Sequence, residues 1–310
     1  MRGCPPSNEF ILANPSLPDN DNHKDIAMAE LPCPTLPAPV SRDTYRSHPV
    51  WRPDALGLSQ DRADDIAVER PLALEYNGIS HAVMLGTPAD LEDLALGFSF
   101  TEGIVRSAAD VYDITTSEQD DGLVIRLDIA GACLHRLRQR RRQLAGRTGC
   151  GLCGLDSLTE VRRPLRPVVL ERPLDDHALV AAARNLFDGQ PLHQLTGATH
   201  AAGWADATGR ITCIREDVGR HNALDKLVGH MLRRCLDPQQ GLAIVSSRAS
   251  FEMVQKAAAA GIAILAAVSA PTSYAITLAQ ELNVMLAGFV REQRYTVYTH
   301  PGHLRTRRRR

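Results

Sequence analysis

The sequence predicts a mixed α/β protein with a layered α/β domain in its C-terminal half and a smaller α+β domain before it. Two patterns support this prediction. From about residue 240, short apolar runs alternate with helical segments, as in a parallel sheet covered by helices. Earlier in the chain, closely spaced strands precede an amphipathic helix. Apolar residues make up 44% of the 310 residues, enough to fill a core.

The two ends of the chain are predicted to lie outside these domains. Ten of the 19 prolines fall within 1–60, among Asn, Asp and Ser residues. Such a stretch buries too little apolar surface to offset the entropy lost on ordering, so we expect a disordered, proline-rich extension. Residues 305–310 form a basic tail, either a solvated terminus or a surface that attracts a partner.

The N-terminal α+β domain is expected to span 61–164. Asn77-Gly78 is typical of a two-residue hairpin turn. Thr87 is predicted to cap a helix that has Pro88 at its first position. The strands of this domain are predicted at 66–68, 72–74, 81–85 and 122–129.

The C-terminal α/β domain is expected to span 165–304. Its strands and helices alternate with short connections, which favours a core of parallel strands. The last strand follows without a helix. The predicted strands are 242–245, 262–268, 284–289 and 294–299, and the predicted helices are 251–260 and 273–282.

Composition excludes several classes of function. The net charge of −1 gives no general attraction to nucleic acid. No apolar run approaches the ~18–20 residues of a membrane span, and the first residues lack the apolar core of a signal peptide. Seven cysteines are an odd and sparse set for a secreted disulfide scaffold. We therefore expect a cytoplasmic protein that acts away from membranes and has reduced thiols.

The sharpest local motif is the Gly149–Gly154 segment, GCGLCG, which contains Cys150 and Cys153. Three glycines in six positions disfavour a regular helix and predict a mobile, accessible loop. Six arginines lie just upstream in 135–147. Positive charge lowers the pKa of a nearby thiol and favours the thiolate, the form that attacks sulfur. The arginines could equally form an exposed helix face.

Several chemistries compete for this cysteine pair. Structural zinc needs two more soft ligands, but Cys133, Cys213 and Cys235 are scattered singly, so no metal site is predicted. A zinc deaminase would carry His-x-Glu and a proline before the first cysteine, and both are absent from the sequence. A dithiol redox protein remains an alternative, although the usual strand-then-helix setting is missing. A persulfide on an exposed thiolate fits best.

A second group of polar residues occupies 216–226, after the segment Leu195–Trp204. Seven polar side chains lie within these eleven residues, interleaved with apolar ones. A surface amphipathic helix would explain the periodicity. It would not explain the Gly219-Arg-His triplet at the helix entry, which is more typical of a site.

Two predicted strand-to-helix turns, 246–250 and 269–273, form a third group. Backbone N–H groups and hydroxyls at helix N-termini bind anions, and Ser246 and Arg248 could add contacts to a phosphate. Simple capping of the two helices by Ser250 and Thr272 is the alternative.

Together these segments resemble the FdhD family of formate dehydrogenase accessory sulfurtransferases. The resemblance extends over about 64–304 and leaves out the proline-rich extension and the arginine tail. The sequence of the cysteine loop agrees with the pattern of the family. The matching stretches are 68–105, 145–154, 195–202, 216–226, 245–256, 268–271 and 298–301.

The resemblance implies a sulfur carrier. Such proteins accept sulfur from a cysteine desulfurase as a persulfide, which maps onto Cys150. They deliver it to the molybdenum of the bis(molybdopterin guanine dinucleotide) cofactor, here a bound substrate and not a permanent cofactor, before its insertion into formate dehydrogenase. The resemblance also implies a cytidine-deaminase-like C-terminal domain and a homodimer. The implied cofactor-binding segment is Phe289, Val290, Arg291, Glu292, Gln293 and Arg294.

Two other functions stay open on the residues alone. A dithiol oxidoreductase would use Cys150 and Cys153 as a redox pair. A cofactor-binding chaperone would use the serine-rich turns Ser246–Ser250 and Ser269–Ser273 without any chemistry at the cysteines.

Overall fold

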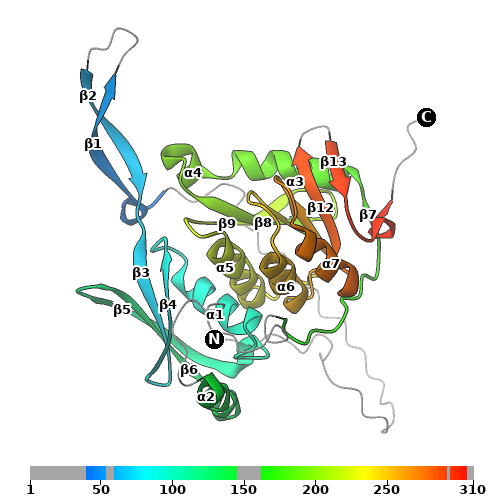
Figure 1. Ribbon diagram of the computed structural model, residues 1–310, viewed down its shortest axis with the longest axis horizontal. Coiled ribbons are helices and arrows are strands. Elements are labelled where there is room, and N and C mark those ends of the chain that lie inside the picture. The colour runs from blue at the N-terminus through cyan, green and yellow to red at the C-terminus, as the bar shows by residue number, and fades with distance from the viewer. Residues whose placement is uncertain (1–39, 54–58, 145–161, 292–293, 306–310) are drawn as a thin grey trace, which may run out of the picture. The chain divides into compact units, whose positions relative to one another are not determined.

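The computed structural model describes residues 40–53, 59–144, 162–291 and 294–305 (Figure 1). These residues form a mixed α/β fold built around a four-stranded and a six-stranded sheet. Residues 36–310 belong to one unit. The domain boundary expected at 164/165 follows the undescribed stretch 145–161 and stays a prediction.

A β-hairpin occupies part of the segment predicted to be disordered. Strands β1 (Tyr45–Pro53) and β2 (Ser59–Ala67) pair antiparallel along their whole length. The expectation of disorder is therefore wrong for the described part of 1–60. The pairing depends on backbone hydrogen bonds between polar strands, a pattern without apolar periodicity, and prolines are tolerated in such edge strands. Residues 1–39 lie outside the described part of the chain.

The four-stranded sheet has the order β4-β3-β6-β5, with β3 and β6 parallel and the other pairs antiparallel. Asn77 and Gly78 both adopt positive φ, which confirms the predicted two-residue turn. The predicted strand 122–129 is also confirmed. The strands are β3 (Arg70–Tyr76), β4 (Ile79–Gly86), β5 (Val111–Gln119) and β6 (Gly122–Ile129).

Two helices cover one face of this sheet. Helix α1 (Leu91–Thr101) supplies Leu94 to the core beside Leu72 and Leu74, and α2 (Gly131–Leu144) adds Leu137. The α2 helix contains most of the arginine-rich segment, so this part of the segment is helical.

The predicted cap of α1 is wrong. The helix begins one turn later than expected, and its N-cap is Asp90. Thr87 is fully buried and uses its backbone and hydroxyl to contact a distant segment: its N–H donates to Asp217, its hydroxyl accepts from the N–H of Val218, and its carbonyl accepts from Lys226. A tertiary role of this kind has no local sequence pattern.

The six-stranded sheet has the order β13-β12-β11-β10-β8-β9. Its three central strands are parallel, which confirms the predicted α/β core, and the flanking strands are antiparallel. The strands are β8 (His200–Asp206), β9 (Ile211–Asp217), β10 (Gly241–Val245), β11 (Ile264–Ala267), β12 (Met285–Arg291) and β13 (Arg294–Val297).

Helices cover both faces of this sheet (Figure 1). One face packs against α5 (Arg220–Arg233), α6 (Phe251–Ala259) and α7 (Ser273–Glu281). The other face packs against α3 (His177–Asp188), which is followed by the short helix α4 (Pro191–Thr196).

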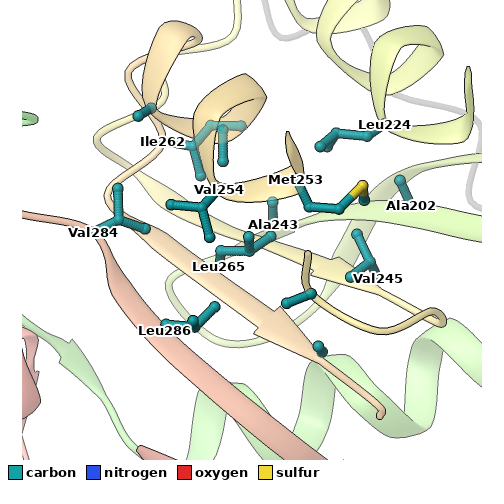
Figure 2. Packing of buried hydrophobic residues seen from close by; sticks show 14 of the residues in the cluster. Ala202, Leu224, Ala243, Val245, Met253, Val254, Ile262, Leu265, Val284 and Leu286 are labelled. Atoms are coloured by element: carbon teal, nitrogen blue, oxygen red, sulfur yellow. The ribbon is translucent and has the colours of Figure 1, made fainter. Parts of the chain in front are cut away.

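Side chains of the central strands alternate between the two faces. In β10, Ala243 and Val245 point to the side of α5 and α6, whereas Leu242 and Ile244 point to the side of α3. Figure 2 shows the first face, where Val254 of α6 lies over the sheet. The strand residues are therefore apolar throughout, as expected for strands buried on both sides.

The C-terminal end of the described chain is paired with the start of this region. Strand β14 (Leu304–Arg305) runs parallel to β7 (Leu174–Asp175), and the Arg305 guanidinium donates to the carbonyl of Pro173. Arg305 therefore does not belong to a free basic tail, and 306–310 lie outside the described residues. Across the described ranges, every helix is too short or too polar to cross a bilayer.

Candidate functional site

The predicted catalytic residues Cys150 and Cys153 lie outside the described residues. The described residues begin again at Arg162, which contacts helices on one face of the six-stranded sheet. Arg162 donates to the Tyr274 hydroxyl at 2.5 Å and pairs with Glu281 at 2.6 Å. The next backbone N–H, of Arg163, donates to Gln255 of α6 at 2.9 Å. The segment that follows the cysteine motif is thus anchored on α6 and α7.

A cavity of about 680 Å³ opens at the edge where β10 and β11 end. It lies between these strands, β12 and the α3–α4 corner, a position at which α/β proteins commonly bind ligands. Apolar side chains line much of it. The lining residues are Ala183, Arg184, Leu186, Phe187, Asp188, Gln190, His193, Gly197, Ala198, Thr199, His200, Ser246, Val268, Val290 and Arg291.

Glu216 fixes the wall of the cavity that α4 provides. Its carboxylate accepts hydrogen bonds from the backbone N–H groups of Leu192 and His193 at 3.0 and 2.7 Å. It also accepts from the Thr199 hydroxyl at 3.0 Å. These contacts satisfy the free N–H groups at the start of α4, so the wall is held in place before any ligand binds.

His200 and Ser246 both line the cavity. Burial lowers the pKa of His200, and the nearby charge of Arg220 lowers it further. His200 is therefore a neutral imidazole at pH 7, able to donate one hydrogen bond and accept another. The Ser246 hydroxyl accepts from the N–H of Ala201 at 2.9 Å, so it is fixed in position.

Three of the predicted cofactor-binding residues line this cavity: Ser246, Val290 and Arg291. Val290 is buried, whereas Arg291 is exposed. Arg291 lies opposite Arg294 in the β12–β13 pairing, which sets two like charges side by side. Such a pair is unfavourable unless an anion compensates it.

The other predicted cofactor-binding residues lie elsewhere. Phe289 is exposed and has φ of 52°, within an irregular stretch of the β12–β13 pairing. Arg248 is exposed and does not line the cavity. Thr272 caps α7 by accepting from the N–H of Ala275, which confirms the capping alternative there. Ser250 is the N-cap of α6, but its buried hydroxyl has no hydrogen-bond partner among the described residues. Glu292 and Gln293 lie outside the described residues.

Four of the seven polar side chains of the segment 216–226 are buried and form a joint with the segment 85–102, namely Asp217, Asn222, Asp225 and Lys226. The Gly219-Arg-His triplet stays a prediction, and its Arg220 and His221 are partly exposed. Asp217 and Lys226 form an ion pair of 2.6 Å, and both side chains are 0% exposed. Asp217 also accepts from the N–H groups of Thr87 and Gly219, at 3.0 and 2.8 Å. The Asn222 amide donates to Asp217 and to the carbonyl of Leu85. The expectation of a surface helix is therefore wrong for these side chains.

A second buried ion pair extends the joint toward α1. Lys256 contacts both oxygens of Asp225, at 3.1 and 2.9 Å, and Glu102 at 2.8 Å. Burial opposes the charge of Lys256, but the two carboxylates outweigh it and raise the pKa of the amine. The Thr101 hydroxyl donates to Asp225 at 2.6 Å.

Helices α1 and α5 cross in close contact at two glycines. A Cβ atom at Gly97 would collide with the carbonyl of Asp225, and one at Gly229 would collide with the carbonyl of Asp93. Only glycine permits this approach. The two sheets are therefore joined through a helix pair that tolerates no added volume.

Asp93 is the centre of a third ionic cluster at the same crossing. It is buried and accepts from Arg215 at 2.9 and 2.7 Å and from Arg233 at 2.9 Å. Burial alone would raise its pKa, but His230 and the two arginines outweigh this effect and lower the pKa from 3.8 to about 2. A polar cavity of about 640 Å³ lies beside the cluster.

Metal-ligand groupings of three or more His, Cys, Asp or Glu side chains do not occur within the described ranges. Two of the scattered cysteines, Cys133 and Cys213, are buried and form no disulfide. Each accepts a hydrogen bond from an arginine, Arg136 and Arg215 respectively. Burial raises the pKa of Cys133, which keeps it a thiol at neutral pH. Cys235 is disulfide-bonded, so the expectation of reduced thiols is wrong for this residue.

The α3–α4 corner is the part of the cavity that sequence reasoning missed. Arg184, Phe187 and Asp188 occupy the last turns of α3, and all three are exposed. The signal in the sequence is an apolar residue, Phe187, between the charged residues Arg184 and Asp188 near the end of an amphipathic helix.

Comparison with known proteins decides the family. The model of the FdhD/NarQ family matches residues 67–305. The chain belongs to the FdhD/NarQ family. The resemblance found in the sequence motifs is thereby confirmed.

Curated members of the FdhD/NarQ family align over most of the chain. The sulfur carrier protein FdhD of Bordetella petrii is 58% identical over 79% of this chain and 88% of its own length. That of Cupriavidus necator is 53% identical over 82% and 87%. A solved structure, a putative formate dehydrogenase accessory protein from Desulfotalea psychrophila, superposes with a TM-score of 0.67 at 22% identity, covering 84% of this chain and all of that one. This last likeness concerns the fold alone.

Proposed function

We propose that this protein is a sulfur carrier that receives sulfur on Cys150 as a persulfide. The observation that carries the proposal is the 58% identity to a protein named as a sulfur carrier, over 79% of the chain. The sequence adds a cysteine between glycines, downstream of an arginine-rich segment. Positive charge of this kind favours the thiolate needed for attack on sulfur.

The proposed loading step is a sulfur exchange. The Cys150 thiolate attacks the outer sulfur of a persulfide on a cysteine desulfurase. A new S–S bond forms at Cys150 as the old one breaks, and the desulfurase cysteine leaves as its thiolate. No external oxidant or reductant is needed, because the transferred sulfur keeps its oxidation level.

The acceptor in this proposal is the bis(molybdopterin guanine dinucleotide) cofactor, bound as a substrate before its insertion into formate dehydrogenase. The cavity of about 680 Å³ is of the usual size for a small-molecule site, and a part of such a ligand fits it. Arg291 and Arg294 offer charge to phosphate groups. The resemblance further implies a cytidine-deaminase-like C-terminal fold, a homodimer and a cytoplasmic location, which we include in the proposal.

Mass spectrometry tests the loading step directly. The full-length protein is incubated with a cysteine desulfurase and cysteine, and we expect a gain of one sulfur atom on Cys150. Cys150→Ala should abolish this gain and the maturation of active formate dehydrogenase in cells. Cys213→Ala is the matched control, because it removes a buried thiol and should leave loading unchanged. Normal maturation with Cys150→Ala would refute the proposal.

Cys153→Ala separates the carrier from a dithiol oxidoreductase. A carrier needs the thiolate of Cys150 but no disulfide with Cys153, so the variant should still accept sulfur. Loading that requires both thiols would favour the oxidoreductase. A protein that binds the cofactor but never acquires sulfur would be a chaperone.

A further inference from the structure

Helix α2 concentrates positive charge that no acidic residue of the helix neutralises. It contains five arginines and no aspartate or glutamate in 14 residues. Acidic residues are absent from the whole stretch 129–155, which also includes Cys150, whereas the full chain has 36 acidic and 35 basic residues. The charge of α2 is therefore a local feature and does not follow from the composition of the chain.

One side of α2 packs on the four-stranded sheet, which leaves its charged side to the solvent. Cys133 and Leu137 are buried in the core of that sheet, and Leu134 packs against it. His135 and Arg138 are exposed. Because its apolar side is occupied, the helix cannot insert into a membrane surface. It also lacks the Phe, Tyr or Trp side chains on which nucleic acid bases stack.

The described arginines of α2 have no carboxylate partner. Arg136 donates to the Cys133 thiol at 3.0 Å. Arg138 forms no hydrogen bond or ion pair with any residue that the structure describes. The sequence spaces arginines four positions apart in this helix, an arrangement in which like charges destabilise an isolated helix. An acidic surface placed against α2 would remove this cost.

Any protein that delivers sulfur to Cys150 has to approach the end of α2. Cys150 follows Leu144, the last residue of the helix, by six positions. A chain segment of that length spans at most about 22 Å. A specific protein–protein interface covers roughly 800 Å² on each partner, a patch about 30 Å across. The donor that contacts Cys150 therefore lies over or beside α2.

We infer that α2 is the docking surface for the protein that donates sulfur, and that this donor presents an acidic surface to the helix. The inference rests on the proposed function, in which Cys150 receives sulfur from a cysteine desulfurase. Opposite charges on two proteins raise their rate of encounter and fix the orientation in which they meet. Docking on α2 thus brings the donor persulfide to the cysteine motif that follows the helix.

Arg138→Glu tests this inference, with persulfide formation on Cys150 followed by mass spectrometry of the full-length protein. Two sulfur donors are compared. One is the cysteine desulfurase with cysteine, and the other is free cysteine persulfide, which passes its outer sulfur to the Cys150 thiolate and leaves as cysteine thiolate. We expect the variant to slow loading by the desulfurase about tenfold, and loading by cysteine persulfide less than about twofold, because the small donor needs no docking surface.

Ionic strength provides a second measurement on the same proteins. Raising it from about 0.1 M to about 1 M shortens the range of electrostatic attraction from roughly 10 Å to about 3 Å. Loading of the wild type by the desulfurase should slow severalfold, whereas Arg138→Glu should depend less on salt. Loading by cysteine persulfide should change little in either protein.

Arg210→Glu is the matched control. Arg210 is exposed in the turn between β8 and β9, and its side chain has no hydrogen bond or ion pair with the described residues. The substitution makes the same change of charge on the other sheet, so loading by both donors should stay unchanged. Arg138→Lys keeps the charge of α2 and should load at close to the wild-type rate.

The remaining outcomes overturn the inference. Equal slowing with both donors would show that Arg138 acts on the Cys150 thiol and not on docking. An unchanged rate with the desulfurase, or equal slowing in Arg210→Glu, would show that α2 is not a specific docking surface. Binding of a single-stranded RNA that Arg138→Glu abolishes, with unchanged desulfurase loading, would assign the helix to nucleic acid. Absence of loading from both donors in the wild type would overturn the proposed function as well.

Discussion

The segment 216–226 and the end of α3 both concentrate charged side chains, yet they are used in opposite ways. In the first, Asp217 and Lys226 are 0% exposed and paired with each other. In the second, Arg184 and Asp188 are exposed and line a cavity. The first segment attracts attention in the sequence because its polar residues are dense. The comparison shows that a high density of polar residues in the sequence does not distinguish a buried structural segment from residues that line a cavity.

The largest effect is expected from Lys226→Met, which tests whether the buried ion pair of the segment 216–226 stabilises the fold. The variant leaves the Asp217 carboxylate buried without its counter-ion, which typically costs about 3–5 kcal/mol. We expect the free energy of unfolding, measured by urea denaturation, to fall by about 3 kcal/mol, since three N–H donors still contact Asp217. Arg138→Met, at an exposed position of α2, is the control and should change stability little. A loss below about 1 kcal/mol in Lys226→Met would contradict the structural role of the joint.

Gly229→Ala tests the helix crossing within the same joint. Its added methyl group would meet the carbonyl of Asp93, so α1 and α5 must separate. Overpacking of this kind costs roughly 1–3 kcal/mol. Gly131→Ala is the matched variant, because its Cβ would enter open space at the start of α2. Thermal unfolding should show a lower midpoint for Gly229→Ala and an unchanged or higher one for Gly131→Ala.

The Asp93 cluster predicts a loss of stability in acid. Its pKa is lowered from 3.8 to about 2, so the folded state favours the charged carboxylate. This stabilisation is complete above pH 3.8 and is lost as the pH falls toward 2. Asp93→Asn should therefore lower stability at pH 7 by about 2 kcal/mol and reduce the difference in stability between pH 4 and pH 2. An unchanged acid dependence in the variant would contradict this assignment.

The smallest expected effect comes from the two helix caps. Thr272 accepts a hydrogen bond from Ala275, so Thr272→Ala should cost about 1 kcal/mol. The buried Ser250 hydroxyl has no hydrogen-bond partner in the part of the chain that the structure describes, so Ser250→Ala should be neutral or slightly stabilising. Denaturation midpoints of the two variants, measured side by side, show which of the two hydroxyl groups stabilises the folded protein. A larger loss for Ser250→Ala would show that its hydroxyl is engaged in the folded protein.

Local patterns predicted the elements that depend on neighbouring residues. The strand at 122–129, the Asn77-Gly78 turn and the alternation of β10, α6, β11 and α7 follow from periodicity and turn chemistry. Thr87 was wrongly predicted to be a cap because its partner Asp217 is 130 residues away. No window of sequence contains both residues.

The same limit applies to the cavity. Ser246 was predicted from a strand-to-helix turn and Arg291 from the family resemblance, and both line one cavity. The contribution of α3 and α4 was missed because Glu216, which fixes their corner, lies more than 20 residues away. The hairpin β1–β2 was missed for another reason, since its strands are polar and are held together mainly by backbone pairing.

The pairing of β14 with β7 links the last described residues to the helix that forms the cavity mouth. The carbonyl of Arg305 accepts from the N–H of Asp176, the residue that begins α3. A pulling force applied at Arg305 would therefore act through this contact on the start of α3. Attachment of the protein at this position would strain the cavity, whereas attachment through an exposed position on β5 would leave it undisturbed.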